Sequence, residues 1–320
     1  MAYSELYDTP FRRKYVAALH GAQRRLRIRE LLRMFGHSHW IREGIRFRII
    51  DFLYGAEYSG PDPFEVDLFG VKYAGSLDSL LDWTVYFFGA FEKENLFLLR
   101  DLLVENADPV FLDVGANVGI FSLFLSKFAS QVHAFEPWQT VRNSFEQKIK
   151  VNGITNISVH PVALGEKNER LAFYSPRGSN MGTGSFSSSH ATDRNRLLGN
   201  LDVVNGDDYL RSRNISKIDV IKIDVEGWEK HVLLGLRNTL IEAAPIVFLE
   251  MSETTLATFG NLNEFWNSVP PGYKASYVTF GRTGVKRTPF DCSKPGNVLL
   301  HVPSSESRLG ANTSRHRILS

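Results

Sequence analysis

The chain of 320 residues is 43% hydrophobic and 22% charged, a composition that allows a full buried core in one large domain with an extension. Its net charge of +2 excludes the strong basic excess of a typical nucleic-acid-binding protein. A single cysteine, Cys292, excludes an internal disulfide framework, and the chain lacks both a signal-peptide-like apolar stretch and an apolar run of roughly 18 residues, so we expect a cytoplasmic protein.

The basic residues are concentrated near the N-terminus. Residues 1–48 hold 11 Lys and Arg against 4 Asp and Glu, which leaves 26 against 31 for the remainder. Within residues 11–48 the arginines are mixed with leucine, isoleucine and methionine, a pattern typical of one or two basic amphipathic helices. We expect residues 1–60 to form a basic helical extension. It either packs on the domain as a solvated arm or contacts a membrane surface or an acidic partner.

Residues 61–105 form a second predicted segment. Between residues 64 and 73 apolar and polar side chains alternate around Gly70, which predicts a small hairpin. From residue 80 to residue 103 the apolar side chains follow a helical spacing. We expect this hairpin and helix to act as a brace or lid over the end of the next strand.

The third predicted segment, residues 106–303, has the pattern of a nucleotide-type domain. The apolar residues 110–114 lead into a glycine-bearing turn that ends at Gly119, and a helix-length apolar segment follows. A second apolar run ends at Glu136, a one-sided helix comes next, and residues 157–164 complete a third run. Crossovers of this length predict an α/β fold with a doubly wound, mostly parallel sheet that binds its ligand at the carboxyl ends of the strands.

The alternation of predicted strands and helices is interrupted by a loop and then resumes. Residues 176–189 are rich in glycine and serine, so we expect a mobile loop on the substrate side. Apolar runs at residues 219–224 and 245–250 predict a fourth and a fifth strand, each followed by a helix. Residues 275–280 and 297–302 predict a closing hairpin pair, and a polar tail occupies the end of the chain, at positions 304–320.

Charges beside the glycine turn indicate which ligand it holds. A dinucleotide would place its pyrophosphate at the N-terminus of the following helix, where the carboxylate of Asp113 would repel it. The turn also reads G-A-N-V-G rather than G-x-G-x-x-G. A cationic ligand fits better, and S-adenosylmethionine carries a sulfonium, an ammonium and a ribose diol. Glu136 lies 23 residues after Asp113, at the end of the next strand, and suits the diol as an acceptor.

A second group of charged residues lies at the end of the fourth predicted strand. Lys222 and Asp224 point to the same side of that strand, and Glu226 follows at the turn. Because a central strand should not bury charge without a partner, we expect these side chains to face the ligand, where one carboxylate accepts the proton of a substrate hydroxyl. Glu250, at the end of the fifth strand, is a further candidate. In the alternative interpretation, Glu226 and Glu229 only favour the first turn of a helix, and Glu250 only caps its strand.

Several stretches of the chain occur together in one known family. They are F-L-D-V-G-A-N-V-G-I-F-S-L, F-E-P, V-A-L-G, I-D-V-I-K-I-D-V-E-G-W-E-K-H-V-L-L-G-L and a strand ending in Glu250. Together they resemble the FkbM-type family of S-adenosylmethionine-dependent methyltransferases over about residues 85–255. The resemblance implies a Rossmann-like class I methyltransferase fold, with a seven-stranded sheet whose last strand is antiparallel. It also implies methyl transfer, usually to a hydroxyl of a sugar, glycan or other secondary metabolite.

The resemblance further implies where S-adenosylmethionine binds. The residues implied to surround its methionine part are Asp113, Gly115, Ala116, Asn117 and Gly119. Glu136 would hold the ribose. The residues implied to line the adenine pocket are Pro137, Trp138 and Ala163. Residues 1–60 have no counterpart in the resemblance, so the role of the basic extension is not implied by it.

Three other functions stay open from the sequence alone. The basic N-terminus would suit a nucleic-acid methyltransferase, but enzymes that methylate base amino groups usually carry N/D-P-P-Y/F where this chain has I-D-V-E-G-W. An NAD-dependent oxidoreductase shares the strand, turn and helix, and a non-catalytic scaffold could keep the same fold. We assign no metal, because the histidines show no zinc-site spacing, although Asp224, Glu226 and Glu250 could share a magnesium ion. The sequence carries no signal for the oligomeric state.

Overall fold

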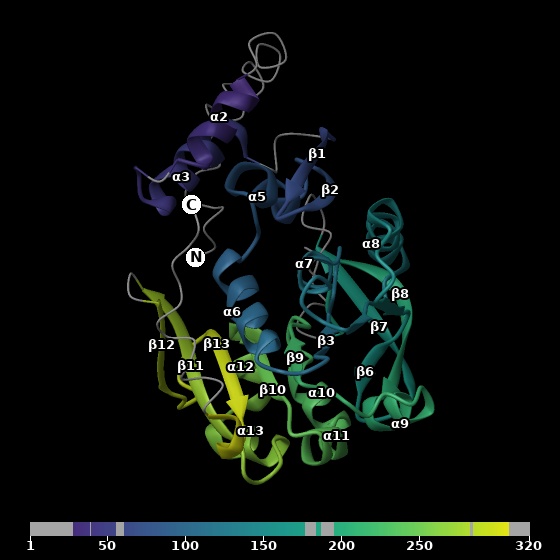
Figure 1. The fold of residues 1–320 in the computed structure, drawn as a ribbon. Coiled ribbons are helices and arrows are strands. Elements are labelled where there is room, and N and C mark those ends of the chain that lie inside the picture. Colours follow the sequence, from purple (N-terminus) through teal and green to yellow (C-terminus); the bar gives the residue numbers. More distant parts are fainter. Residues whose placement is uncertain are drawn as a thin grey trace. The chain divides into compact units, whose positions relative to one another are not determined.

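The computed structural model describes residues 28–38, 40–55, 61–176, 184–186, 195–281 and 284–306 (Figure 1). The described residues up to Glu92 form one compact unit, which we call the N-terminal unit. Those from Lys93 onward form a second, which we call the sheet unit. The start of the basic extension, most of the predicted loop at 176–189 and nearly all of the predicted tail lie outside the described residues.

The N-terminal unit contains three described helices and a two-stranded hairpin. The helices are α2 (Ile28–Gly36), α3 (Glu43–Tyr54) and α5 (Leu80–Phe88). The hairpin pairs β1 (Pro63–Leu68) with β2 (Val71–Ser76), as the alternating pattern predicts, and Asp67 closes its turn by accepting the N–H of Gly70. In neither unit does a described helix have the length and apolar character needed to cross a membrane.

The sheet unit is built on an eight-stranded sheet. In order across the sheet, its strands are β12 (Gly284–Pro289), β11 (Lys274–Gly281), β13 (Gly296–His301), β10 (Ile246–Met251), β9 (Val220–Ile223), β3 (Val110–Val114), β4 (Gln131–Phe135) and β5 (Ile157–His160). The strands from β10 to β5 are parallel, and β13 runs antiparallel to β10. The expected doubly wound, mostly parallel α/β fold is confirmed. The expected number of seven strands is wrong for the described sheet, because β12 pairs with β11 at the edge.

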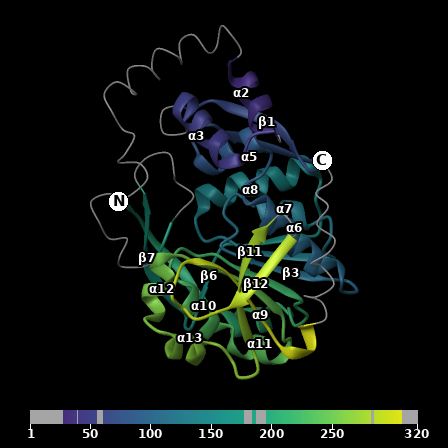
Figure 2. The ribbon, with the colours of Figure 1, turned by 90° about the vertical axis from the view of Figure 1, so that its left-hand side faces the viewer.

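Helices cover both faces of this sheet (Figure 2). On one face, α6 (Lys93–Val104) packs against α7 (Ile120–Leu125). Beneath them, α6 contacts β9 and α7 contacts β3. The other described helices are α8 (Gln139–Asn152), α9 (Gly206–Ser212), α10 (Glu229–Gly235), α11 (Arg237–Glu242), α12 (Glu253–Phe259) and α13 (Leu262–Ser268). Residues of α10, α11 and α13 share one buried cluster with Leu112, Ile221 and Leu249 of the strands. Because both faces are covered, β3 and β9 are buried along their whole length.

The stretch at 157–164 forms two strands rather than the single strand we expected. β5 ends at His160, and the following residue is Pro161, which has no N–H to donate to a sheet. The chain then enters a separate three-stranded sheet in the order β6 (Ala163–Gly165), β8 (Asn195–Asn205) and β7 (Glu169–Pro176). Ala163 is therefore the first residue of a strand outside the main sheet.

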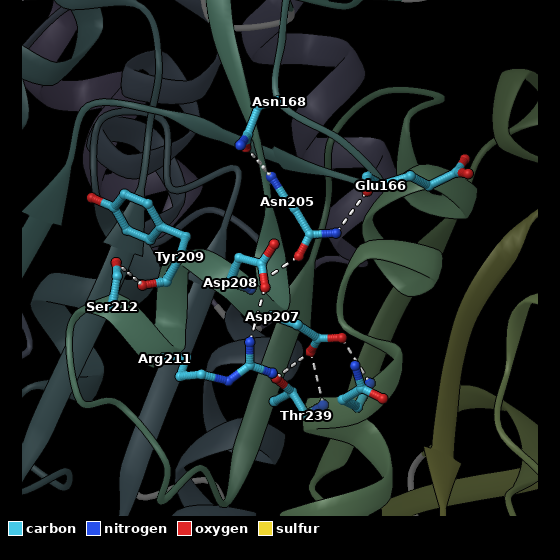
Figure 3. Close-up of polar contacts among 10 residues, drawn as sticks. Glu166, Asn168, Asn205, Asp207, Asp208, Tyr209, Arg211, Ser212 and Thr239 are labelled. Carbon is cyan, nitrogen blue, oxygen red and sulfur yellow. Dashed lines mark hydrogen bonds and ion pairs between the residues drawn. The ribbon is translucent and has the colours of Figure 1, made fainter.

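Polar side chains connect α9 to α11 (Figure 3). The side chain of Asn205 caps α9 by accepting the N–H of Asp208 at 2.9 Å. The carboxylate of Asp207 accepts the N–H of Thr239 at 2.8 Å and its hydroxyl at 2.7 Å. Thr239 lies in the first turn of α11, whose N–H groups have no partner within their own helix, so Asp207 stabilises the start of α11.

Two histidines lie buried on β4 and β5. Nδ1 of His133 is 3.2 Å from Nε2 of His160, and Nδ1 of His160 is 3.2 Å from the hydroxyl of Tyr209. The ring of His160 also stacks on Phe135, with ring centroids 4.5 Å apart. Burial lowers the pKa of His160 to about 4 and lowers the pKa of His133 as well, so both rings are neutral at neutral pH.

We expect the sheet unit to lose stability as the pH falls. Because the pKa of folded His160 lies below the unfolded value of 6.5, its contribution is complete above pH 6.5 and is lost progressively toward pH 4. From about pH 7 to about pH 5, this residue should lower the free energy of unfolding by about 2 kcal/mol. Denaturant unfolding at both pH values measures the effect. His160→Gln should reduce it, and His231→Gln, at a more exposed ring, should not; equal pH dependence in both variants would contradict this assignment.

Candidate active site

The glycine turn after β3 is held in place by close backbone packing. Gly115 and Gly119 have φ values of +83° and +85°, which favour glycine. A Cβ on Gly115 would overlap the carbonyl of Asp224, and one on Gly119 would overlap the ring of Phe145. The N–H groups of Gly115 and Ala116 both donate to the carbonyl of Phe135 on β4. The turn therefore brings bare backbone to the carboxyl ends of β3, β4 and β9.

The carboxylate of Asp113 lies at the base of this turn. It is fully buried, and its Oδ2 accepts the hydroxyl of Ser122 at 2.6 Å. Its Oδ1 lies 3.9 Å from Nζ of Lys222 and, within the described part of the chain, accepts no hydrogen bond. Burial raises the pKa of Asp113, and the ammonium of Lys222 only partly opposes this. Asp113 is thus a hydrogen-bond acceptor with spare capacity.

Lys222 connects Asp113 to a second carboxylate, Asp224. Lys222 pairs with Asp113 across β3 and β9, and its Nζ donates to Oδ2 of Asp224 at 2.9 Å. The same ammonium lies 4.8 Å from the centre of the Phe121 ring. This lysine is almost completely buried. The two carboxylates and the Phe121 ring offset the free-energy cost of removing its charge from water.

Asp224 also shares a hydrogen bond with Glu250. Ile223 of β9 pairs with Leu249 of β10, so the next residue on each strand reaches the same edge of the sheet. Burial opposes the ionisation of Asp224, but Lys222 and the hydrogen bond from Glu250 together lower its pKa below the ordinary value. The side chain of Asp224 is 23% exposed, so an ionised oxygen remains accessible.

Glu136 follows β4 directly, on the other side of the turn. Its Oε2 accepts the N–H of Asn117 at 3.0 Å, and its Oε1 accepts the N–H of Trp138 at 2.8 Å. Only 7% of the residue is exposed, and burial raises the pKa of Glu136 to about 7 despite these two bonds. Each carboxylate oxygen has a further lone pair, so the pair of oxygens can accept both hydroxyls of a ribose diol.

The residues expected to line the adenine pocket come from two different segments. Pro137 and Trp138 come directly after Glu136 and are partly buried. Ala163 lies at the start of β6 in the small sheet. The ring of Trp138 lies 6.4 Å from that of Phe173 on β7, so two aromatic rings lie close together here. Their contact with adenine stays a prediction.

The turn after β9 is organised by Glu229. Glu229 is 1% exposed and accepts the N–H groups of Val225 and Gly227, each at 2.9 Å, and the hydroxyl of Thr255 at 2.8 Å. Glu226 has a positive φ of 53°, and its carbonyl accepts the hydroxyl of Ser185 at 2.6 Å. The interpretation of Glu229 as a simple first-turn residue was incomplete, because its carboxylate fixes the backbone that follows Asp224.

The donor set suits S-adenosylmethionine. Glu136 offers acceptors to the ribose, and Asp113 and Asp224 place negative charge near the turn, where a sulfonium and an ammonium are favoured. Ser122 was not predicted as a site residue, although a hydroxyl inside the apolar segment I-F-S-L-F-L is unusual and could have indicated its role. Among the described residues, no three His, Cys, Asp or Glu side chains are arranged to hold a metal ion, and this includes the three carboxylates considered above for magnesium.

Removing the Glu229 carboxylate should loosen the turn after β9. In Glu229→Ala the N–H groups of Val225 and Gly227 lose their acceptor, and we expect unfolding to become easier by about 3 kcal/mol. Chemical denaturation measures the loss. The matched control is Glu166→Ala, whose carboxylate is 45% exposed, and it should change stability by less than about 0.5 kcal/mol. Equal losses in the two variants would contradict the structural role of Glu229.

A comparison with protein-family models matches residues 113–269 to the methyltransferase FkbM domain. The matched range begins at Asp113 and includes the glycine turn, Glu136, Asp224 and Glu250. It therefore contains both groups of carboxylates described above. The match overturns the alternative of an NAD-dependent oxidoreductase.

Named proteins with similar sequences include two methyltransferases. The hexuronic acid methyltransferase AglP of Haloferax volcanii is 31% identical over 147 residues, which are 43% of this chain and 55% of that protein. The 2-O-methyltransferase NoeI of Sinorhizobium fredii is 27% identical over 167 residues, which are 48% of this chain and 68% of that protein. The crystal structure of an FkbM methyltransferase from Methylobacillus flagellatus covers 87% of this chain and 59% of its own, with 16% identity and a TM-score of 0.40. Residues 113–269, just under half of the chain, are thus an FkbM methyltransferase domain, the type of domain found in S-adenosylmethionine-dependent methyltransferases.

Proposed function

We propose that the protein transfers a methyl group from S-adenosylmethionine to a hydroxyl of a sugar or glycan. The observation that carries the proposal is the ionised, partly exposed carboxylate of Asp224, held between Lys222 and Glu250. An ionised carboxylate at the end of β9 can accept a proton from a hydroxyl, whose proton must leave when its oxygen is methylated. The names of AglP and NoeI, a hexuronic acid methyltransferase and a 2-O-methyltransferase, support this acceptor class.

In this proposal, binding and positioning of the cofactor and the acceptor provide most of the rate acceleration. S-adenosylmethionine supplies, when bound, a methyl group on a sulfonium that is already an activated donor. Glu136 binds the ribose, and the turn from Gly115 to Gly119 accommodates the methionine part. The protein then needs to align the acceptor oxygen with the methyl group and exclude water, both of which accelerate transfer without a strong base.

Asp224 completes the proposed reaction by taking the hydroxyl proton. The ammonium of Lys222, 2.9 Å from Asp224, keeps the carboxylate ionised before transfer. The hydrogen bond with Glu250 also lowers the pKa of Asp224. In this scheme Lys222 and Glu250 are positioning residues, and Asp224 is the base.

The identity of the methylated atom tests the proposed function. The protein is incubated with methyl-¹³C S-adenosylmethionine and a panel of hexuronic acids, neutral sugars and oligosaccharides, with amines and RNA as competing acceptors. We expect the label on a sugar oxygen, identified by the carbon chemical shift of the methyl group. Label on nitrogen or on RNA would contradict the proposal and would favour the nucleic-acid methyltransferase alternative.

Asp224→Asn should lower turnover more than it lowers cofactor affinity. The amide has almost the same shape but cannot accept the proton, so we expect kcat to fall by roughly 100-fold while the Kd for S-adenosylmethionine changes by less than about threefold. Asp202→Asn, at a carboxylate that is 60% exposed on β8, is the matched control and should keep full turnover. A parallel loss of affinity and turnover would identify Asp224 as a binding residue instead.

Glu136→Ala should weaken S-adenosylmethionine binding by roughly 1.5 to 3 kcal/mol, because the ribose loses its acceptor. Binding favours the ionised carboxylate. With its pKa near 7, affinity should therefore be complete above about pH 7 and decline as the pH falls through that value. Calorimetry at several pH values measures both effects. Glu105→Ala, at an exposed carboxylate, is the control; unchanged affinity in Glu136→Ala would show that the ribose binds elsewhere.

A further inference from the structure

The N-terminal unit exposes a concentration of large apolar side chains. Of the twelve large hydrophobic residues that are exposed in the described chain, seven lie between positions 31 and 52, and the other five are scattered. We call this group the apolar face. Its members are Leu31, Met34, Trp40, Ile41, Ile45, Ile49 and Phe52. Single exposed hydrophobic residues are ordinary on a protein surface, but a concentration in two adjacent helices indicates a binding surface.

Three members of the apolar face form a stripe along α3. Ile45 and Ile49 are four residues apart and Phe52 follows three residues later, so these three lie on one side of the helix, and Ile41 lies just before its start. The opposite side carries the buried Ile50, through which α3 packs in its own unit. The stripe is therefore a second apolar surface, in addition to the one that the N-terminal unit uses for its own packing.

Arginines border this stripe. At 100° per residue, Arg48 projects about 60° to one side of Ile45, and Arg42 lies at the N-cap position just before α3; both are exposed. Residues 24–48 of the sequence contain eight arginines against two glutamates, Glu30 and Glu43. An apolar stripe with arginines beside it is the pattern of a helix that lies in the interface between lipid acyl chains and headgroups.

Trp40 strengthens this pattern. It precedes the stripe and is 97% exposed, the highest value among the exposed hydrophobic residues. Tryptophan favours the level of the lipid headgroups, where its ring is partly buried and its N–H stays hydrated. A fully exposed indole that adjoins Ile41 in the sequence is costly in water and favourable at such an interface.

We infer that the apolar face docks the N-terminal unit on an anionic lipid surface, with α3 lying in the plane of the interface. The twelve-residue α3 is much shorter than a membrane span, so it would lie on the bilayer rather than cross it. Charge decides between this occupant and a second copy of the chain. Two copies would bring arginine-bordered faces together and repel each other, whereas anionic headgroups neutralise the same arginines.

Vesicle co-sedimentation of the full chain tests the inference. The probes are phosphatidylcholine vesicles with and without phosphatidylserine. We expect binding only to the phosphatidylserine vesicles, and weaker binding as salt is raised. The double variant Ile45→Ser/Ile49→Ser should bind at least about tenfold more weakly. Its matched control is Val151→Ser/Ile241→Ser, at two similarly exposed positions of the sheet unit, and this control should bind as the unchanged protein does.

The fluorescence of Trp40 gives an independent reading. Trp40→Phe should abolish the blue shift that phosphatidylserine vesicles produce, because the other tryptophans lie outside the apolar face. Equal binding to both vesicle types, no binding at low salt, or equal losses in the two double variants would overturn the inference. Self-association that Ile45→Ser/Ile49→Ser abolishes, without vesicle binding, would also overturn it and would assign the face to a contact between copies.

Discussion

The active-site region depends on one buried cation, the ammonium of Lys222. A lysine on a central strand is stable only if its charge is compensated, and Asp113 and Asp224 provide that compensation from β3 and β9. The same pairing fixes the distance between the glycine turn and the end of β9. Gly115 is needed there because the carbonyl of Asp224 occupies the space of a Cβ. The pairing that compensates the charge of Lys222 therefore also determines the geometry of the glycine turn.

Three carboxyl groups at this edge of the sheet have different roles because their surroundings differ. Glu136 is buried among backbone N–H groups, and its pKa rises to about 7. Asp224 has a cation at 2.9 Å and a carboxyl donor beside it, and its pKa falls. Glu229 is buried and bonded on both oxygens, so it supports the backbone rather than a ligand. In the proposed scheme, a binding carboxylate, a base and a structural carboxylate thus arise from the same residue chemistry.

Sequence patterns predicted the parts of the fold that repeat a simple period. Apolar runs located the central strands, and charged residues at their carboxyl ends could be assigned to one crevice because parallel strands end at the same edge. β12 was missed because its residues are mostly half-exposed and its sequence, G-V-K-R-T-P, has no apolar run. The break at Pro161 could have been predicted from the sequence, because proline has no N–H to donate to a sheet. The function of Glu229 could not, since it depends on the positive φ values of Glu226 and Gly227, which bring two N–H groups toward one carboxylate.

A crystal structure with S-adenosylhomocysteine tests the central claim most directly, because it locates the cofactor relative to the two groups of carboxylates. We predict that the ribose hydroxyls lie within hydrogen-bond distance of Glu136 and that the sulfur faces the side chain of Asp224 across the turn at Gly115. A ligand whose ribose contacts neither oxygen of Glu136, or whose sulfur faces away from Asp224, would contradict the account.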